Sequence, residues 1–268
     1  MNKLIELFQN KSINILSVYF TAGFPRLTDT AYILECLEKA GADIAEVGIP
    51  FSDPMADGPV IQRSNHIALQ NGMNPDILFK QLKEIKPKLN IPVVLMGYLN
   101  PAYKYGMERF CSECADAGVS GLIFPDLPLD IYLDEYAALY EKYDLCFIPL
   151  ITPQTPDERV LRLAEASKGF IYVVSSSVTT GGKAELDDNN FYFSHIRSLI
   201  PGKNLLIGFG IHDADTFSKA CRQSNGGIIG TAFINTVAES ERENMESVIR
   251  YFVDSKRNPP LLSPDIRI

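Results

Sequence analysis

The sequence predicts a single α/β domain over residues 1–268, folded as a (β/α)8 barrel of the TIM type with an extra N-terminal helix. Short apolar segments rich in β-branched residues alternate with segments of helical periodicity, and eight such pairs fit the length of this fold. Nearly continuous apolar strands are typical of a parallel sheet covered on both faces. The alternative, an open doubly wound sheet, usually carries a GxGxxG turn after its first strand. Residues 21–25 of this chain read TAGFP instead.

The elements follow one another in the order that the barrel requires. After a short amphipathic helix at residues 1–9, the expected strands are 15–20, 44–48, 92–96, 121–124, 146–150, 171–174, 205–209 and 227–230. The expected helices are 29–40, 75–85, 107–117, 132–143, 157–166, 191–199, 213–221 and 233–238. Helix caps are expected at Thr28 or Asp29, at Thr155 with Glu158, and at Asp213.

Two connections are longer than a barrel needs. Residues 48–91, after the second strand, have room for a structured loop and two helices. Residues 175–188, after the sixth strand, are rich in Ser, Thr and Gly. Loops of this length in a compact domain are usually functional and often act as lids. The tail from residue 256 contains three prolines and is expected to be extended on the surface.

Composition excludes several classes of protein. A net charge of -8 and a pI near 5.0 disfavour nucleic-acid binding, which needs a basic surface. The N-terminus lacks the apolar run of a signal peptide, and no apolar stretch is long enough for a membrane span. Five scattered cysteines indicate a reducing compartment, so we expect a cytoplasmic protein. Cys111 and Cys114 form a CxxC, which we interpret as neighbours on a helix rather than as a metal or redox site.

The second strand contains a carboxylate within its apolar run. Active sites of TIM barrels lie at the carboxyl ends of the strands. Glu46 stands within an apolar strand, where burial should raise its pKa unless a cation pairs with it. The eight strand segments contain no Lys or Arg, which favours a catalytic role over a structural ion pair. Asp53 and Asp57 follow in a loop rich in Pro and Gly, where Asp is also an ordinary turn residue.

Glycines at the ends of the last two strands predict a phosphate site. The segments GFGI at 208–211 and GGIIGT at 226–231 each lead into a helix. TIM barrels often bind phosphate there through backbone N–H groups and a helix N-terminus. The glycines could alternatively serve only as tight turns, but two such motifs on adjacent final strands favour the phosphate site. Residues 180–182 (TGG), in the loop after the sixth strand, would add a third group of donors.

The remaining chemistry is assigned by elimination. His66, His195 and His212 show no metal-ligand spacing, so no metal site is expected. The sequence has no GxSxG motif or Cys/His arrangement for a covalent nucleophile, and no lysine at a strand end for a Schiff base. Carboxylates therefore remain as the acid–base groups, with Tyr172 at the sixth strand as a possible helper.

The motif AEVGIPFSDPMADGP at residues 45–59 resembles the signature of the tryptophan synthase alpha chain family. The likeness extends along the chain through FTAGFP at 20–25, YLNP at 98–101, PDLP at 125–128, FIPL at 147–150, YVVS at 172–175 and both terminal glycine motifs. The resemblance implies a lyase without a cofactor that cleaves indole-3-glycerol phosphate to indole and glyceraldehyde 3-phosphate. It also implies an alpha2-beta2 heterotetramer with a beta subunit that holds pyridoxal phosphate and receives the indole.

The resemblance also implies roles for individual residues. Glu46 would move protons to the indole C3 and from the side-chain hydroxyl, Asp57 would bind the indole N–H, and Tyr172 would orient Glu46. The other implied substrate and phosphate contacts are Tyr19, Ile61, Tyr98, Phe209, Thr180, Gly181, Gly210, Gly230 and Thr231. The implied contacts with the beta subunit are Pro50, Asp53, Pro54, Met55 and the 98–101 segment that contains Asn100.

Two departures from the family pattern stand out. Residues 175–183 read SSSVTTGGK, where many relatives have an arginine and the order GVTG, so closure of this lid onto Asp57 through Thr180 could differ. Thr231 stands where relatives carry serine, and it keeps the hydroxyl. Three other functions stay open on the sequence alone: a related phosphate-binding barrel isomerase or synthase, a stand-alone indole-releasing lyase, and a non-catalytic scaffold. The Glu46/Asp57 pair argues against the first and the last.

Overall fold

The barrel strands form one parallel sheet. The computed structural model describes residues 1–174 and 190–257. Its strands are β1 (Ile15–Thr21), β2 (Ile44–Gly48), β3 (Val93–Met96), β4 (Val119–Ile123), β5 (Cys146–Phe147), β6 (Leu150–Ile151), β7 (Ile171–Val174), β8 (Leu205–Gly208) and β9 (Gly226–Ile229). Each strand pairs in parallel with its neighbours in the order β5-β4-β3-β2-β1-β9-β8-β7-β6.

The barrel is closed because the first and last strands of this order, β5 and β6, are consecutive pieces of one chain segment. Only Ile148 and Pro149 separate β5 from β6. The Ile148 N–H donates to the Leu122 carbonyl of β4 (3.2 Å), and the Tyr172 N–H of β7 donates to the Pro149 carbonyl (2.9 Å). Pro149 has no N–H to donate, which interrupts the regular pairing at this point. The nine described strands therefore fill eight barrel positions, and the predicted (β/α)8 barrel is confirmed.

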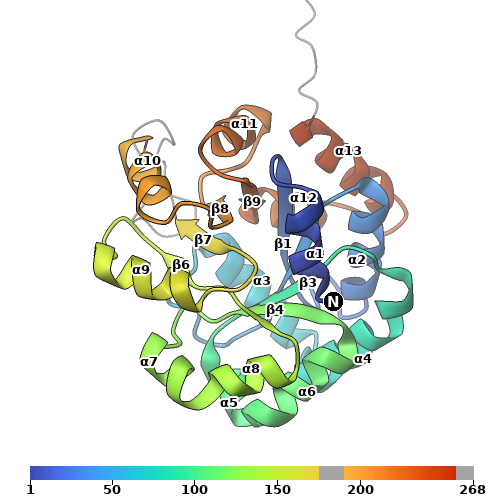
Figure 1. The fold of residues 1–268 in the computed structure, drawn as a ribbon. Helices are drawn as coiled ribbons and strands as arrows, with labels where there is room; N and C mark the ends of the chain where they lie inside the picture. The colour runs from blue at the N-terminus through green and yellow to red at the C-terminus, as the bar shows by residue number, and fades with distance from the viewer. Residues whose placement is uncertain (175–189, 258–268) are drawn as a thin grey trace, which may run out of the picture.

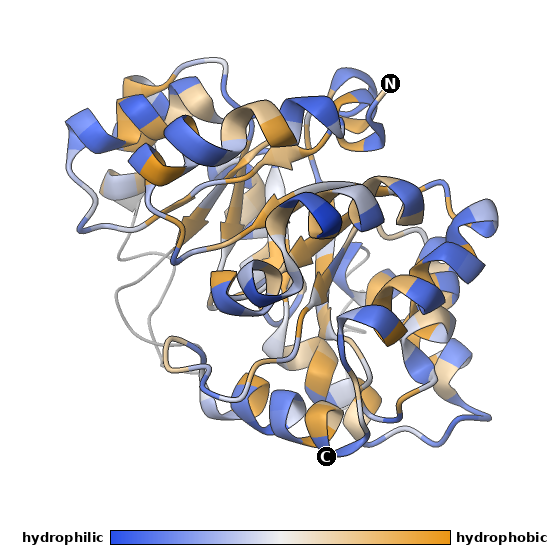
Figure 2. Cartoon of the chain, turned by 90° about the horizontal axis from the view of Figure 1, so that it is seen from below, coloured by the Kyte–Doolittle hydropathy of each residue, from blue (hydrophilic) through white to orange (hydrophobic). Residues whose placement is uncertain are grey.

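The helices surround the strands (Figure 1). In chain order they are α1 (Lys3–Asn10), α2 (Asp29–Ala40), α3 (Pro59–Gln70), α4 (Pro75–Ile85), α5 (Leu99–Tyr105), α6 (Met107–Ala117), α7 (Leu129–Ile131), α8 (Ala137–Lys142), α9 (Asp157–Ala166), α10 (Asn190–Leu199), α11 (Ala214–Gln223), α12 (Thr231–Ala238) and α13 (Met245–Arg257). A short 3-10 turn (Lys86–Lys88) follows α4, and a π-helical turn (Tyr132–Tyr136) joins α7 to α8. Figure 2 shows apolar strands inside and mixed helices around them.

Several details of the helices differ from the prediction. The helix predicted at 132–143 begins earlier, at Leu129, and contains the π-helical turn. Thr155 was expected to cap α9, which was wrong: Pro156 is the N-cap, and the Thr155 hydroxyl accepts from the Thr152 N–H (3.0 Å) in the preceding turn. Asp213 is confirmed as a cap, with a reciprocal capping box to Thr216. Helix α13 was not predicted and runs to Arg257, into the expected tail.

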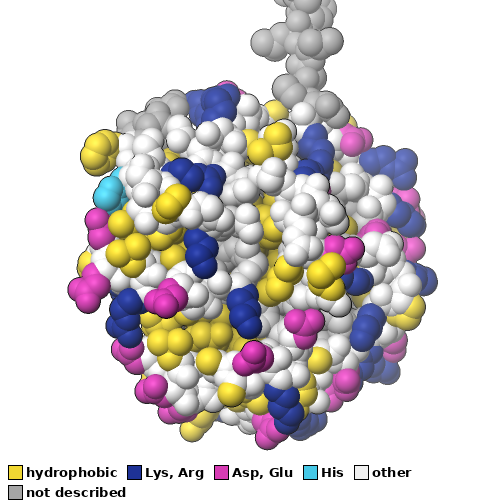
Figure 3. All heavy atoms as spheres, in the orientation of Figure 1, with side chains coloured by type: hydrophobic (Ala, Val, Ile, Leu, Met, Phe, Trp, Pro, Cys, Tyr) yellow, Lys and Arg dark blue, Asp and Glu magenta, His cyan; other side chains and the backbone are white. Residues whose placement is uncertain are grey.

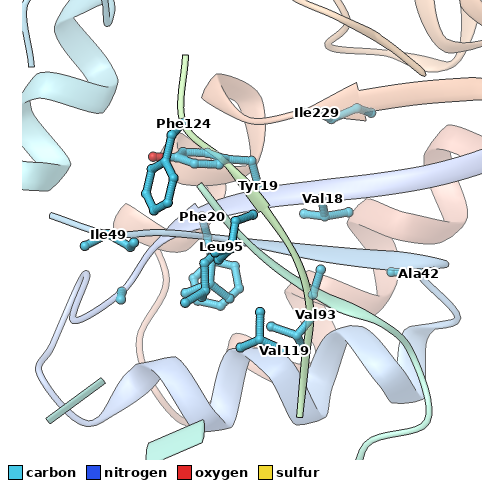
Figure 4. Packing of buried hydrophobic residues seen from close by; sticks show 14 of the residues in the cluster. Val18, Tyr19, Phe20, Ala42, Ile49, Val93, Leu95, Val119, Phe124 and Ile229 are labelled. Carbon is cyan, nitrogen blue, oxygen red and sulfur yellow. The ribbon is translucent and has the colours of Figure 1, made fainter. Parts of the chain in front are cut away.

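The core has two layers because side chains alternate between the faces of each strand. One layer fills the barrel interior with Ile15, Ile44, Val94, Ile123, Cys146, Ile148, Phe170, Tyr172, Val174, Leu206 and Ile228. The other lies between the strands and the helices and includes Val18, Leu95 and Val119, part of which is shown in Figure 4. Acidic, basic and apolar side chains are interspersed on the face seen in Figure 3. No helix in the described ranges is long and apolar enough to span a membrane.

Helix α1 closes one end of the barrel. It is the dark blue helix of Figure 1, and its Leu4 is fully buried in the interior layer. The Asn2 side chain caps the helix by accepting from the Leu4 N–H (2.9 Å) and donates to the Ser120 carbonyl of β4 (2.8 Å). The carboxyl ends of the strands lie at the opposite end of the barrel.

We predict that Leu4→Ala destabilises the whole barrel. The substitution leaves a cavity beneath the interior layer and should lower the free energy of unfolding by about 2 to 5 kcal/mol. Urea unfolding followed by circular dichroism measures the loss. Leu161→Ala, at a site that is 47% exposed, is the matched control and should change it by less than about 1 kcal/mol. Equal losses in the two variants would show that α1 is not part of the core.

Candidate active site

Two adjoining cavities lie at the carboxyl ends of the strands, each of about 320 Å³. They share the walls Tyr19, Asp57, Met96 and Phe209. The first cavity extends to the ends of β8 and β9, where its further walls are Ile61, Tyr172, Gly210, Ile211, His212, Ile228, Gly230, Thr231, Ala232 and Asn235. The second extends toward β3–β6, with Ile49, Ala56, Asn65, Gly97, Tyr98, Pro125, Leu150, Thr152, Gln154 and Val174. Eight of the predicted substrate and catalytic residues therefore meet around the first cavity, and Tyr98 lines the second.

Glu46 lies inside the barrel next to these cavities. Its side chain is fully buried, and Oε1 accepts a hydrogen bond from the Ser17 hydroxyl (2.6 Å). Its Oε2 has no hydrogen-bond partner in the described part of the chain. Burial raises the pKa of Glu46 to about 7, and the bond from Ser17 partly offsets this rise. The described residues thus give Glu46 no Lys or Arg partner, and the structural ion pair considered from the sequence is absent among them.

Asp57 is held in place by the loop that carries it. Burial raises the pKa of Asp57 to about 6, and a hydrogen bond from Tyr98 partly offsets the rise. The Tyr98 hydroxyl also accepts from the Ala56 N–H (2.9 Å). The Gln62 side chain donates to the Asp57 carbonyl (3.0 Å), which ties the loop to α3. Asp57 therefore presents a fixed carboxylate to both cavities.

Two tyrosines lie near both carboxylates. A Cβ at Gly48 would come within 2.3 Å of the Tyr19 hydroxyl, and one at Gly208 within 2.1 Å of the Tyr172 hydroxyl. Only glycine lets these rings cross the neighbouring strands. Burial raises the pKa of both tyrosines, and the negative charges of Glu46 and Asp57 raise both further. The four groups are therefore close enough to influence one another, and both tyrosines stay neutral.

The far end of the first cavity is formed by the segments that follow β8 and β9. Phe209 and Gly210 both have positive φ, 70° and 74°, which is uncommon for a residue other than glycine. Gly230 and Thr231 form the N-cap and first residue of α12. The first N–H groups of a helix have no partner within the helix and suit an anion. Thr180 and Gly181, predicted for the same site, lie outside the described residues.

The predicted partner surface is largely exposed. Met55 is 82% exposed, Asp53 and Asn100 are also exposed, and Pro54 is partly so. Pro50 is different, because it is buried within the chain and offers little surface to a partner. The exposed surface is therefore the tip of the loop after β2 together with the start of α5.

Several residues of the site were not predicted. Ser17 was missed although it is the one serine of the apolar strand β1, two residues before Tyr19 and hence on the same face. Met96, His212 and Asn235 line the first cavity without belonging to any motif that the sequence singled out. No group of three or more His, Cys, Asp or Glu side chains suited to a metal ion occurs within residues 1–174 and 190–257.

Comparisons with known proteins agree with the fold. A sequence model described as "Tryptophan synthase alpha chain" matches residues 6–258. The tryptophan synthase alpha chains of Flavobacterium johnsoniae and Parabacteroides distasonis are 48% and 47% identical, over 90% and 92% of this chain and 95% and 96% of theirs. The solved tryptophan synthase subunit alpha from Legionella pneumophila has a TM-score of 0.86 at 31% identity, covering 96% of this chain and 97% of that one. Tryptophan synthase from M. tuberculosis, in its aminoacrylate-bound form, has a TM-score of 0.83 at 26% identity and covers 96% of this chain and 98% of its own.

We predict that Glu46 makes the fold less stable as pH rises. Folding raises its pKa from 4.5 to about 7, so its stabilising contribution is fully present below pH 4.5 and is lost as pH rises through 7. Between pH 5 and pH 8 this loss is about 2 to 3 kcal/mol. Glu46→Gln should remove it, whereas Glu158→Gln at an exposed site should not. Urea unfolding at both pH values tests this, and an unchanged pH dependence in Glu46→Gln would contradict it.

Proposed function

The chain belongs to the tryptophan synthase alpha chain family and so is an enzyme of tryptophan synthesis, and we propose that it cleaves indole-3-glycerol phosphate to indole and glyceraldehyde 3-phosphate. The observation that carries the proposal is the pair of cavities with two carboxylates beside them, the buried Glu46 and the half-buried Asp57. This substrate has a flat aromatic end and a dianionic end, joined by a short hydroxylated chain. Each end matches one cavity.

The cavities differ in the way that such a substrate requires. Ile49, Pro125, Leu150 and Val174 make the second cavity suitable for an indole ring. The backbone at Gly210, Gly230 and Thr231 makes the first suitable for the phosphate. The scissile bond would then lie where the cavities meet, at Tyr19, Asp57 and Phe209.

The two carboxylates divide the chemistry in this proposal. The protonated carboxyl of Glu46 donates a proton to the indole C3, which gives an indolenine cation. Asp57 accepts a hydrogen bond from the indole N–H and stabilises that cation. Glu46 then accepts the proton of the hydroxyl on the side-chain carbon that is bonded to C3. The bond between C3 and that carbon breaks, the hydroxyl-bearing carbon becomes the aldehyde, and the electron pair of the broken bond returns to the indole ring. The proton count balances, because one proton enters at C3 and one leaves the hydroxyl.

The pKa values suit these two roles. A general acid–base group works best when its pKa lies near the working pH, and burial brings the pKa of Glu46 to about 7. With a pKa of about 6, Asp57 is mostly ionised at neutral pH, as a hydrogen-bond acceptor must be. The neutral Tyr172 packs against Phe209, with ring centroids 6.2 Å apart, and would orient both Glu46 and the substrate.

The proposed reaction needs no cofactor in this chain, because protein side chains can carry every proton transfer. We propose that indole passes to a tryptophan synthase beta subunit that holds pyridoxal phosphate, in an alpha2-beta2 heterotetramer. The exposed Asp53, Met55 and Asn100, with the partly exposed Pro54, would form the contact. The five unpaired cysteines, four of them buried, fit the cytoplasmic location proposed from the sequence.

The first test is an indole-release assay on the purified chain with indole-3-glycerol phosphate. We expect Glu46→Gln to fold, to bind substrate with a similar KM, and to lower kcat by about two decades or more, because general acid–base catalysis contributes about 10² to 10⁴-fold. Asp57→Asn should be severe, and Asp57→Glu milder, since it keeps the charge.

Glu243→Gln, at an exposed site in the turn before α13, is the control and should keep the wild-type kcat. Turnover near the wild-type rate in Glu46→Gln would refute the assigned mechanism. A wild-type chain that releases no indole, with or without a beta subunit, would refute the proposed reaction itself.

A second prediction concerns the partner. Adding a tryptophan synthase beta subunit should raise the rate of indole release. Met55→Asp should raise the Kd for that subunit about tenfold or more, because it places a charge at the centre of the proposed contact. Tyr251→Asp, on a residue of α13 that is 75% exposed, should leave the Kd unchanged. Titration calorimetry measures both, and equal effects of the two substitutions would place the contact elsewhere.

A further inference from the structure

The hydroxyl group of Ser17, inside the barrel, makes its hydrogen bond to Glu46. Ser17 lies in β1, whose seven residues are all buried, and its own exposure is 0%. Its hydroxyl donates to Oε1 of Glu46 at 2.6 Å, and both partners are buried. A hydroxyl buried without a hydrogen bond is destabilising, so this bond is what makes serine acceptable at the position.

The neighbours of Ser17 show what an ordinary barrel would have there. Its register partners are Ile44 on β2 and Ile228 on β9. Both belong to the apolar layer that fills the barrel interior. An alanine or valine at position 17 would continue this layer without burying a polar atom. The serine therefore serves the carboxylate rather than the packing.

The contact makes the two oxygens of Glu46 unequal. Oε1 is tied to Ser17, whereas Oε2 is buried and has no partner in the described part of the chain. We propose that Ser17 is a positioning residue that holds Oε1 so that Oε2 is the atom that exchanges protons with the substrate. This inference rests on the proposed function, since it assigns a role within the same reaction.

The hydrogen bond has two physical consequences. It fixes a side chain with several rotatable bonds in one orientation, which keeps the proton-transferring oxygen aligned with the substrate. It also favours the ionised carboxylate and so opposes the effect of burial. Without Ser17, the carboxyl group would be both less well oriented and harder to ionise.

The decisive experiment titrates Glu46 directly in the full-length chain. Carbon-13 label in the glutamate carboxyls gives an NMR signal for Glu46, assigned by its absence in Glu46→Gln. In Ser17→Ala we expect the pKa of Glu46 to rise by about one unit, because a hydrogen bond to the charged form is lost. We also expect kcat at pH 7 to fall about tenfold with KM unchanged, and the alkaline limb of the pH profile to move up with the pKa.

Two variants separate positioning from a general loss of packing. Ser17→Thr keeps the hydroxyl and should restore both the pKa and most of kcat. Ser120→Ala removes another buried serine, on β4, and should leave both unchanged. All variants are first checked for the wild-type circular dichroism spectrum and thermal midpoint, and the NMR titration is read even where activity is too low to measure.

The outcomes are distinct from those that test the proposed function. An unchanged Glu46 pKa and an unchanged kcat in Ser17→Ala would overturn the inference while the wild type still releases indole. Equal losses in Ser17→Ala and Ser17→Thr would also overturn it, because the hydroxyl would then be irrelevant. A wild type without indole release would refute the reaction, and the NMR titration would still show whether Ser17 controls Glu46.

Discussion

The burial of one carboxyl group, Glu46, inside an apolar barrel is the constraint on which the site depends. An isolated carboxylate in such surroundings is unstable, so its pKa rises to about 7 and it exists in both protonation states near neutral pH. The surrounding residues follow from this requirement. Ser17 keeps the group from being wholly unpartnered, and Tyr19 and Tyr172 stay neutral beside it. The fold accepts a cost in stability at Glu46 because a barrel of this size has a large apolar core to offset it.

The contacts that stabilise the fold and the cavities of the candidate site lie at opposite ends of the barrel. One end is closed by α1 and fixed by contacts such as those of Asn2 and Leu4. The other end carries the loops, the two cavities and the exposed tip at Met55. The loop after β2 contributes to both the cavities and the exposed tip, because Asp57 lines the cavities and Met55, two residues before it, lies at the surface. A partner bound at Met55 would therefore act on the loop that also holds Asp57, the carboxylate that the proposed reaction places on the indole N–H.

The barrel could be predicted from the sequence because buried parallel strands are continuous apolar runs. Glu46 could be picked out as a candidate catalytic residue because its carboxylate interrupts one of these runs. It could not show that Pro149 splits the fifth strand, since the segment is apolar on both sides of the proline. The π-helical turn at 132–136 was not predicted, because it adds only one residue to a helical turn and leaves the polar–apolar pattern of the sequence unbroken. Thr155 looked like a cap, but the proline after it takes the N-cap position. The contact of Ser17 with Glu46 was not predicted, because in a strand buried on both faces the sequence does not show which side chains point into the barrel. The burial of Pro50 was not predicted either, because it depends on tertiary contacts.

The most direct test of the central claim is the structure of the chain bound to an unreactive substrate analogue, with an indole ring joined to a phosphate by a plain propyl chain. We expect the indole in the cavity with Leu150, its N–H on Asp57, its C3 beside Oε2 of Glu46, and the phosphate at Gly210, Gly230 and Thr231. An analogue bound with its phosphate beside Leu150, or with its C3 out of reach of Glu46, would contradict the assignment of the two carboxylates.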